Sequence, residues 1–164
     1  EGTTTDGVAM DDPATSPFRQ APTFLSGGGG LLSTTADVLK FCRMILGRGE
    51  FDGARLIAPK TLDLMAANHI PGARDIAEVS TPSMFSEARY AGVGFGLGFA
   101  TTTNVARTLM PGSEGDLFWG GMASTYFWVD PGQDMAVVQM AQMLPSSLYP
   151  IRRELRTLVY SALV

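Results

Sequence analysis

The sequence is poor in the residues that build disulfides and metal sites. Among its 164 residues there are one cysteine, Cys42, and one histidine, His69. A lone cysteine cannot form an internal disulfide, and no Cys and His residues have the spacing of a structural zinc site. We therefore expect no metal site and no cofactor.

Charged side chains are also scarce, at 17% of the chain, compared with roughly 25% in ordinary globular domains. The formal net charge is -4 and the basic residues form no stripe, so we expect no nucleic-acid partner. No apolar run reaches the length of about 18 residues that a membrane-spanning helix requires. The sequence therefore predicts no membrane span.

Composition changes along the chain and predicts two parts. Residues 1–25 are rich in Thr, Asp, Pro, Ser and Ala without a helical or strand period, which is typical of an irregular linker. Residues 26–164 are long enough for a domain with a sizeable core. The four glycines at 27–30 are not followed by the Lys and Ser or Thr of a phosphate loop, so they predict tight packing.

Two segments in the first half predict helices. Residues 36–46 carry apolar side chains at three- and four-residue spacing, the mark of one buried helix face. Cys42 lies on that stripe, which favours a core thiol over a reactive one. Pro59 favours the first position of a second helix that runs to about residue 68. His69 follows its last turn, and we expect it in a capping or surface role.

The segment that begins near residue 147 also has a helical period. Its apolar residues are expected to face inward: Leu148, Ile151, Leu155, Leu158, Val159 and Ala162. Its charged residues are expected on the solvated side: Arg152, Arg153, Glu154 and Arg156. A role for one of these arginines in holding a substrate carboxylate is the less favoured alternative.

The middle of the chain is irregular and then glycine-rich. Residues 70–90 are expected to form a long irregular connection, which is a candidate lid. In residues 92–100, glycines alternate with larger apolar side chains. This period of two predicts a strand with something packed close to its glycine face.

Residues 116–142 read as three short strands, and the rest of the chain is expected to be arranged around them. Both faces of residues 125–129 are apolar, which predicts a central strand that is covered on both sides. Asp130-Pro131-Gly132-Gln133 has Pro second and Gly third in a four-residue turn, the signature of type II. The first reversal carries Trp119-Gly120-Gly121, where the missing side chains allow close approach or a sharp turn.

Two of these segments, in this order, carry a resemblance to a known family. They are Trp119-Gly120-Gly121 followed by residues 125–131 and an apolar strand, and residues 26–34, which lead into a helix with Asp37 and Phe41. From about residue 23 onward the chain resembles the C-terminal part of the serine β-lactamase-like family. That family includes class C β-lactamases, penicillin-binding DD-peptidases and family VIII carboxylesterases.

The resemblance implies an α+β fold for residues 26–164, as the C-terminal portion of a β-lactamase-like domain. We expect an antiparallel sheet of about three to five strands packed against a C-terminal helix, with two further helices from the helical region. This is a partial β-lactamase/transpeptidase-like fold. Because the chain starts at Glu1 instead of Met, we also expect an internal starting point within a longer protein.

Members of the family use a Ser-x-x-Lys nucleophile motif, a Tyr-x-Asn or Ser-x-Asn base motif, and a third motif that is Lys-Thr-Gly or a variant such as Trp-Gly-Gly. No serine of this chain has Lys three places on, and no tyrosine or serine has Asn two places on. The resemblance therefore implies no catalytic side chain here. It implies a substrate-binding segment formed by Trp119, Gly120, Gly121 and Met122. The backbone N–H of Gly121 or Met122 would donate to the oxyanion.

The leading hypothesis is a C-terminal fragment of a serine hydrolase whose full-length parent cleaves a small-molecule ester or β-lactam through an acyl-enzyme. The fragment alone is expected to be inactive. Trp119 cannot bind a carboxylate as the family's Lys can, which favours neutral esters, unless Trp119 only fills the sheet–helix core. The alternative is a non-catalytic, penicillin-binding-like module that binds a peptide or protein. An exposed sheet edge would also permit self-association.

Overall fold

The computed structural model describes residues 7–81 and 90–163 and separates into two units, Glu1–Thr34 and Thr35–Val164. Within its described part, residues 7–34, the first unit has one regular element, the 3-10 helix η1 (Pro17–Arg19). The side chain of Ser16 caps η1 by accepting a hydrogen bond from the Phe18 N–H at 3.2 Å. The expected division at residues 25 and 26 stays a prediction.

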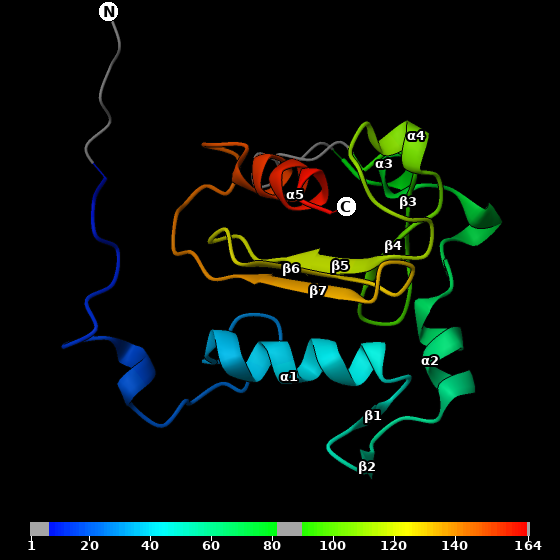
Figure 1. Ribbon diagram of the computed structural model, residues 1–164. Coiled ribbons are helices and arrows are strands. Elements are labelled where there is room, and N and C mark those ends of the chain that lie inside the picture. Colours follow the sequence, from blue (N-terminus) through cyan, green and yellow to red (C-terminus); the bar gives the residue numbers. More distant parts are fainter. Residues whose placement is uncertain (1–6, 82–89, 164) are drawn as a thin grey trace, which may run out of the picture. The chain divides into compact units, whose positions relative to one another are not determined.

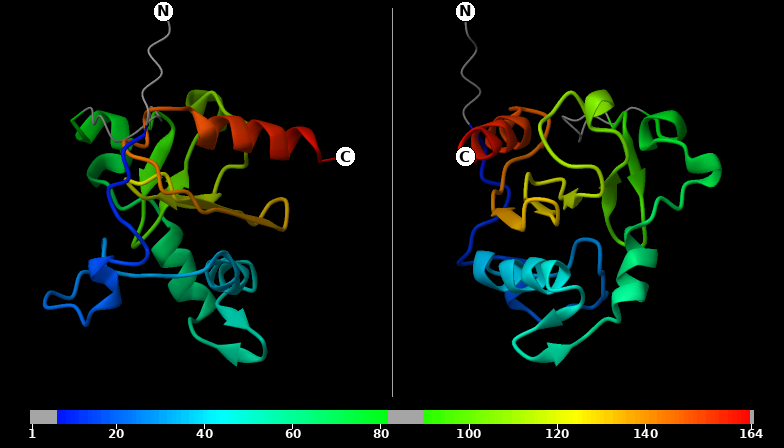
Figure 2. Two further views of the ribbon diagram at one scale, coloured as in Figure 1. Left: turned by 90° about the vertical axis from the view of Figure 1, so that its left-hand side faces the viewer. Right: turned by 45° about the vertical axis from the view of Figure 1, so that its right-hand side comes forward.

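The second unit is built on a five-stranded antiparallel sheet. Its strands lie side by side in chain order: β3 (Val93–Phe95), β4 (Ala100–Thr102), β5 (Leu117–Gly120), β6 (Tyr126–Asp130) and β7 (Met135–Gln139). Helix α1 (Thr35–Leu46) lies against one face of the sheet and helix α5 (Ile151–Ser161) against the other (Figure 1). Figure 2 shows the same three layers from two further sides. The α+β class and the packing of the C-terminal helix on the sheet are confirmed.

Two buried apolar clusters lie on the two faces of the sheet. The cluster on the α1 face contains Cys42, Met44, Ile45, Leu62, Phe99, Leu117 and Val129. The cluster on the α5 face contains Val93, Ala100, Phe118, Tyr126 and Trp128. Neighbouring residues of a strand point to opposite faces, so the full burial of both Trp128 and Val129 confirms that β6 is covered on both sides. Strand β6 lies between β5 and β7, and β7 forms one edge of the sheet.

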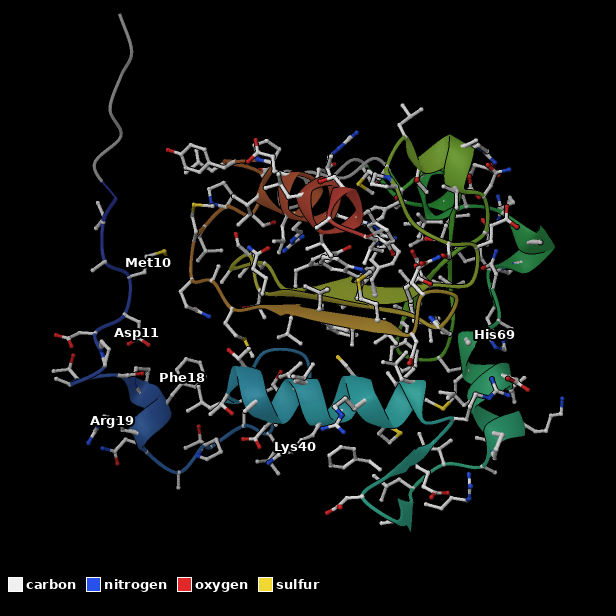
Figure 3. All side chains as sticks on the ribbon, in the orientation of Figure 1. Met10, Asp11, Phe18, Arg19, Lys40 and His69 are labelled. Atoms are coloured by element: carbon white, nitrogen blue, oxygen red, sulfur yellow. The ribbon has the colours of Figure 1, made fainter. Side chains whose placement is uncertain are left out.

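The first half of this unit follows the sequence pattern closely. Helix α1 spans the predicted stripe, with Asp37 in its first turn, where a negative charge complements the helix dipole. A two-stranded hairpin, β1 (Glu50–Phe51) and β2 (Ala54–Arg55), connects it to α2 (Pro59–Ala66). His69 follows α2 (Figure 3), and its Nε2 lies 2.7 Å from the Leu64 carbonyl oxygen of the last helical turn. The expected capping or surface role of His69 is therefore confirmed, since the side chain is exposed and lies against the end of α2.

The connection after α2 is more regular than expected. It contains the 3-10 helix η2 (Pro71–Ala73) and the short helix α3 (Ile76–Val79), while part of the candidate lid, residues 82–89, lies outside the described residues. A further short helix, α4 (Val105–Thr108), was not predicted. The Asn104 side chain caps it by accepting from the Arg107 N–H at 3.1 Å. No helix in the described parts of the chain combines the length and apolar character needed to cross a bilayer.

The predicted single strand at 92–100 is wrong, because this segment forms two strands, β3 and β4, joined by a tight reversal. The Gly96 N–H donates to the Phe99 carbonyl at 2.7 Å, and Gly98 adopts a φ of 110°, which turns the chain. The expected close packing is confirmed at Gly94 and Gly96 but not at Gly98, where an added Cβ would meet nothing. A Cβ on Gly94 would overlap the Asn68 side chain, and one on Gly96 would overlap the Met65 carbonyl. The tight packing predicted for the four glycines at 27–30 is wrong for the first three, since a Cβ there would also lie in open space.

The predicted type II turn after β6 is also wrong. Type II needs a positive φ at its third residue, but the left-handed residue here is Asp134, at a φ of 48°, and not Gly132. The Asp130 carboxylate explains the difference, because its Oδ1 accepts from the N–H groups of Gly132 at 2.9 Å and Gln133 at 3.2 Å. These bonds hold the turn in another form.

The face of α5 that meets the sheet differs most from the prediction. Arg152 and Arg156 are only 7% and 3% exposed, whereas Leu158 is 67% exposed. Asp116 explains this rotation, because its fully buried carboxylate, one residue before β5, forms an ion pair with Arg156. A buried carboxylate needs a positive partner, so α5 turns its arginines toward the sheet. The predicted solvated position of Arg152 and Arg156 is therefore corrected.

Candidate functional site

The predicted substrate-binding segment forms a tight loop between β5 and β6. Strand β5 ends at Gly120, and the Gly121 N–H donates to the Thr125 carbonyl at 2.7 Å. The Ser124 N–H donates back to the Gly121 carbonyl at 3.1 Å, and Ser124 takes the positive φ, 74°, that makes the reversal. We call residues 120–125 the third-motif loop. Its backbone is closed by its own hydrogen bonds.

This geometry distinguishes between the two expected oxyanion donors. The Gly121 N–H is occupied by Thr125. Among the described residues no acceptor is bonded to the Met122 N–H, and Met122 is 56% exposed. Of the two groups, the Met122 N–H is therefore the one available to a ligand.

Trp119 lies half-exposed beside the third-motif loop. Its ring is stacked with that of Tyr90 at 6.1 Å between centroids and meets that of Phe95 edge to face at 4.8 Å. It belongs to neither buried cluster, and 37% of its surface is open. These contacts fix the indole while leaving part of it accessible, which favours a binding role over simple filling of the core.

Gly120 makes room for a side chain from α5. A Cβ on Gly120 would lie 2.8 Å from the Arg152 Cζ, too close for any real contact. The Arg152 Nη2 donates to the Gly121 carbonyl at 2.5 Å and also lies 3.4 Å from the Thr125 carbonyl. Its guanidinium lies 5.5 Å from the centre of the Tyr126 ring. The close approach expected at the Trp-Gly-Gly reversal is thus made by a guanidinium.

A small cavity of about 20 Å³ lies between the sheet, α5 and neighbouring loops. It is lined by Tyr90, Val93, Met110, Phe118, Gly120, Tyr126, Arg152 and Arg153. Its size suits one water molecule and falls far short of the roughly 300 Å³ at which ligand pockets begin. The cavity is therefore a space behind the third-motif loop and not a substrate pocket.

A buried polar network fixes α5 to the sheet behind the loop. Asp116 forms its ion pair with Arg156 and also accepts from the Thr102 hydroxyl. Burial raises the pKa of the Asp116 carboxyl, while Arg156 and Thr102 act against that rise. Arg156 also donates through Nε to the Pro111 carbonyl at 2.8 Å. These contacts join β4, β5 and α5 at one point.

Asp130 forms a second centre of this network. Its Oδ2 accepts from the Tyr160 hydroxyl at 2.5 Å and from the Ser113 hydroxyl at 2.8 Å. Burial and the bond to Asp130 raise the pKa of Tyr160 well above its usual value, so Tyr160 keeps the proton that it donates. The end of β6 is thereby tied to the last helix.

Other nucleophilic and metal-binding groups are not assembled in the parts of the chain that the structure describes. No group of three or more His, Cys, Asp or Glu side chains there could hold a metal ion. Cys42 is buried, and its desolvation raises the pKa of the thiol to about 11. A thiol in that environment is unreactive near neutral pH.

The four residues predicted for the substrate-binding segment, Trp119 to Met122, lie together because they are contiguous in the chain. The structure adds a fifth residue to this site, Arg152, which the sequence analysis missed. Arg152 was placed on the solvated side of its helix. Two signals pointed to it: Arg152 and Arg156 are four residues apart, and so lie on one helix face, and Gly120 lacks a side chain where a long one must fit.

Known proteins match this chain in sequence and in fold. The family model described as Beta-lactamase matches residues 2–161. Protein Rv1367c of Mycobacterium tuberculosis (strain ATCC 25618 / H37Rv) is 33% identical over 132 residues, which are 79% of this chain and 32% of that protein. The same figures hold for protein MT1414 of M. tuberculosis (strain CDC 1551 / Oshkosh). The chain therefore spans about a third of the length of these relatives.

Solved structures show the same fold. EstCE1, a hydrolase with promiscuous acyltransferase activity, matches with a TM-score of 0.67 and 25% identity over 88% of this chain and 35% of its own. Simvastatin synthase (LovD) from Aspergillus terreus matches with a TM-score of 0.73 and 20% identity over 98% of this chain and 41% of its own. A penicillin-binding protein homolog from Caulobacter crescentus matches with a TM-score of 0.56 and 16% identity over 75% of this chain and 30% of its own. With a family match over nearly its whole length, the chain belongs to the β-lactamase family.

Proposed function

We propose that this chain is the part of a β-lactamase-like serine hydrolase that carries the third active-site motif and one of the two oxyanion donors. The observation that supports this most directly is the third-motif loop, where Gly121 is bonded internally and the exposed Met122 offers its N–H. Preorganised backbone donors of this kind stabilise the anionic tetrahedral intermediate of acyl transfer. The family match supplies the reaction class.

The proposed reaction needs residues that this sequence does not contain. A serine Oγ would attack the carbonyl carbon of the substrate, a nearby base would take its proton, and the Met122 N–H would bind the resulting oxyanion. The leaving group would then depart, and water would release the acyl group from the serine. Since the chain has no Ser-x-x-Lys or Tyr-x-Asn motif, we expect no turnover from it alone.

Trp119 determines the proposed substrate class. At the position where the family pattern has Lys, an indole cannot form the charge-assisted bond that holds a carboxylate. The ring is held by Tyr90 and Phe95, so it offers a fixed apolar surface on the strand that leads into the third-motif loop. We infer a preference for neutral esters over carboxylate-bearing β-lactams. The similarity to EstCE1, a hydrolase with promiscuous acyltransferase activity, supports broad acyl chemistry.

The test uses the gene product that contains this chain together with a Ser-x-x-Lys segment. Its kcat/KM would be measured on p-nitrophenyl butyrate and on a chromogenic cephalosporin, for the native sequence and for Trp119→Lys. We expect the native protein to favour the ester and Trp119→Lys to shift the ratio toward the cephalosporin. Leu158→Lys, which adds the same charge at an exposed site on α5, is the control. An unchanged ratio in Trp119→Lys would refute the substrate assignment.

A second candidate function rests on the free edge of the sheet. Strand β7 ends the strand order, and its sequence, Met135 to Gln139, carries no charged residue that would discourage pairing. A non-catalytic module could bind an extended peptide or a second copy there. Light scattering of this chain and of Gln139→Lys tests the edge: association that Gln139→Lys abolishes would favour the binding module. A degraded Ser-x-x-Lys in the longer gene product would favour it too.

A further inference from the structure

The contact between Arg152 and the third-motif loop assigns this side chain a second role beyond packing. Arg152 is 7% exposed and reaches from the first turn of α5 to the loop between β5 and β6. It bonds the Gly121 carbonyl at 2.5 Å and lies 3.4 Å from the Thr125 carbonyl, the same two residues that close the loop. One guanidinium therefore holds both ends of the reversal that presents Met122.

The bonded carbonyl belongs to the same peptide group as the proposed oxyanion donor. The Gly121 C=O and the Met122 N–H share one planar amide, and in the trans form they point in opposite directions. The carbonyl accepts from the buried guanidinium at 2.5 Å and, over a longer distance of 3.1 Å, from the Ser124 N–H, so the Met122 N–H points away from both. Fixing the carbonyl therefore fixes the direction of the N–H.

A cation on the carbonyl oxygen also changes the donor strength of the amide. Charge-assisted bonds are stronger than neutral ones, and bonded groups polarise one another along a chain. Electron density drawn toward the Gly121 oxygen leaves the Met122 N–H more positive and a better donor to an anionic oxygen. We propose that Arg152 is a positioning residue that orients and polarises the Gly121–Met122 peptide for the oxyanion. This inference rests on the proposed function.

Gly120 leaves the space that the contact between Arg152 and the third-motif loop requires. A Cβ at this position would lie 2.8 Å from the Arg152 Cζ and 3.0 Å from each terminal nitrogen. The obstacle is the end of a flexible side chain, so Gly120→Ala would move the guanidinium off the loop without a backbone clash. It perturbs the contact from the opposite side and leaves the arginine itself in place.

The first experiment uses this chain and needs no activity. The ¹⁵N and ¹H resonances of the Met122 amide would be compared among the native sequence, Arg152→Met and Gly120→Ala. We expect both variants to shift the amide proton upfield, the direction of a weaker donor. Arg153→Met is the control, since the one described polar contact of the Arg153 side chain is to the Leu109 carbonyl, at 3.4 Å, and not to the third-motif loop. An unmoved Met122 resonance in both variants would overturn the proposal.

The second experiment uses the longer gene product, with kcat, KM and the inhibition constant of phenylboronic acid as readouts. Because losing an oxyanion donor outright costs about 10²–10³-fold in kcat, we expect a loss of about 10–100-fold when the donor is only misdirected. KM should change little. The inhibition constant of phenylboronic acid, which forms a tetrahedral adduct with the serine, should rise by a similar factor. Arg152→Lys, which keeps the positive charge, should retain part of kcat and part of the boronate affinity.

The outcomes separate the inference from the function on which it rests. An active native protein whose kcat and boronate inhibition are unaffected by Arg152→Met and Gly120→Ala overturns the role of Arg152 and leaves the proposed function standing. If kcat falls, KM rises and the melting temperature drops together in these variants, Arg152 only supports the structure. That result also overturns its proposed positioning role. A native protein without hydrolytic activity removes the proposed function, even where the Met122 resonance moves as expected.

Discussion

Replacing Arg156 by methionine should remove a large part of the stability of the second unit. Asp116 is 0% exposed and Arg156 is 3% exposed, so the variant would leave a carboxylate with no cation in a dry site. Breaking a buried ion pair from one side costs about 3–5 kcal/mol of unfolding free energy, out of about 5–15 kcal/mol for a typical domain. The guanidinium also lies 5.5–5.7 Å from the rings of Phe118, Trp128 and Tyr160, and these contacts would be lost as well.

Urea unfolding followed by tryptophan fluorescence measures the loss, since Trp128 is fully buried in the native state. Asp116→Asn combined with Arg156→Met should be more stable than Arg156→Met alone, because a neutral amide tolerates burial and can still bond Thr102. Arg55→Met serves as control, because the Arg55–Glu50 pair is about half exposed and such pairs contribute below about 1 kcal/mol.

The pH dependence provides a separate check. Without Arg156, burial raises the pKa of Asp116 still further, so lowering the pH protonates it and reduces the cost of the substitution. The difference in unfolding free energy between native protein and variant should therefore narrow from pH 7 to pH 4. A loss under 1 kcal/mol at pH 7, or a difference that widens in acid, would refute the reasoning.

Three further predictions concern single groups. Cys42, with its pKa raised to about 11 by burial, should resist iodoacetamide at pH 8 until urea unfolds the chain, and fast labelling of native protein would contradict the core position. Tyr160 keeps its proton in the folded state above the pH of about 10 at which a free tyrosine titrates. The free energy of unfolding should therefore fall as pH rises beyond that value. In Tyr160→Phe the slope of this fall against pH should be smaller by the amount that corresponds to about one proton per molecule, and equal slopes in the two proteins would contradict the prediction. Leu109 is exposed at a φ of 56° after α4, so Leu109→Gly should raise the free energy of unfolding by about 1 kcal/mol, and a drop in melting temperature would count against backbone strain there.

Much of the fold was readable because its signals are local. The three strands between residues 116 and 142 and helix α1 are each specified by their own alternation or periodicity. The type II turn was misjudged because an Asp130 side chain, and not glycine, holds that reversal. The strand at 92–100 was misjudged because period two persists through a hairpin whose reversal is set by Gly98. In each case the pattern was present, but the bonds of one side chain or the angle of one backbone residue decided the geometry.

The face of α5 could not be read from the helix itself. Hydrophobic periodicity assumes that charged residues face water, and this holds only where the opposite surface is apolar. Here the opposing surface contains Asp116, which lies 40 residues before its partner Arg156. It also contains the Gly121 carbonyl, which lies 31 residues before its partner Arg152. The four residues from Trp119 to Met122 were recognisable because they are contiguous, whereas Arg152 joins them only through tertiary contact.

The position of the two arginines has a consequence for how the protein is made. Every strand of the sheet is translated before Arg152, Arg156 and Tyr160, so a nascent chain that has just exposed β7 outside the ribosome still lacks the cation for Asp116 and the Tyr160 hydroxyl that donates to Asp130. Domains emerge from the ribosome at roughly 5–20 residues per second, which leaves about one to a few seconds in which these two carboxylates must remain hydrated. The ion pair of Asp116 can therefore form only once the last helix has emerged.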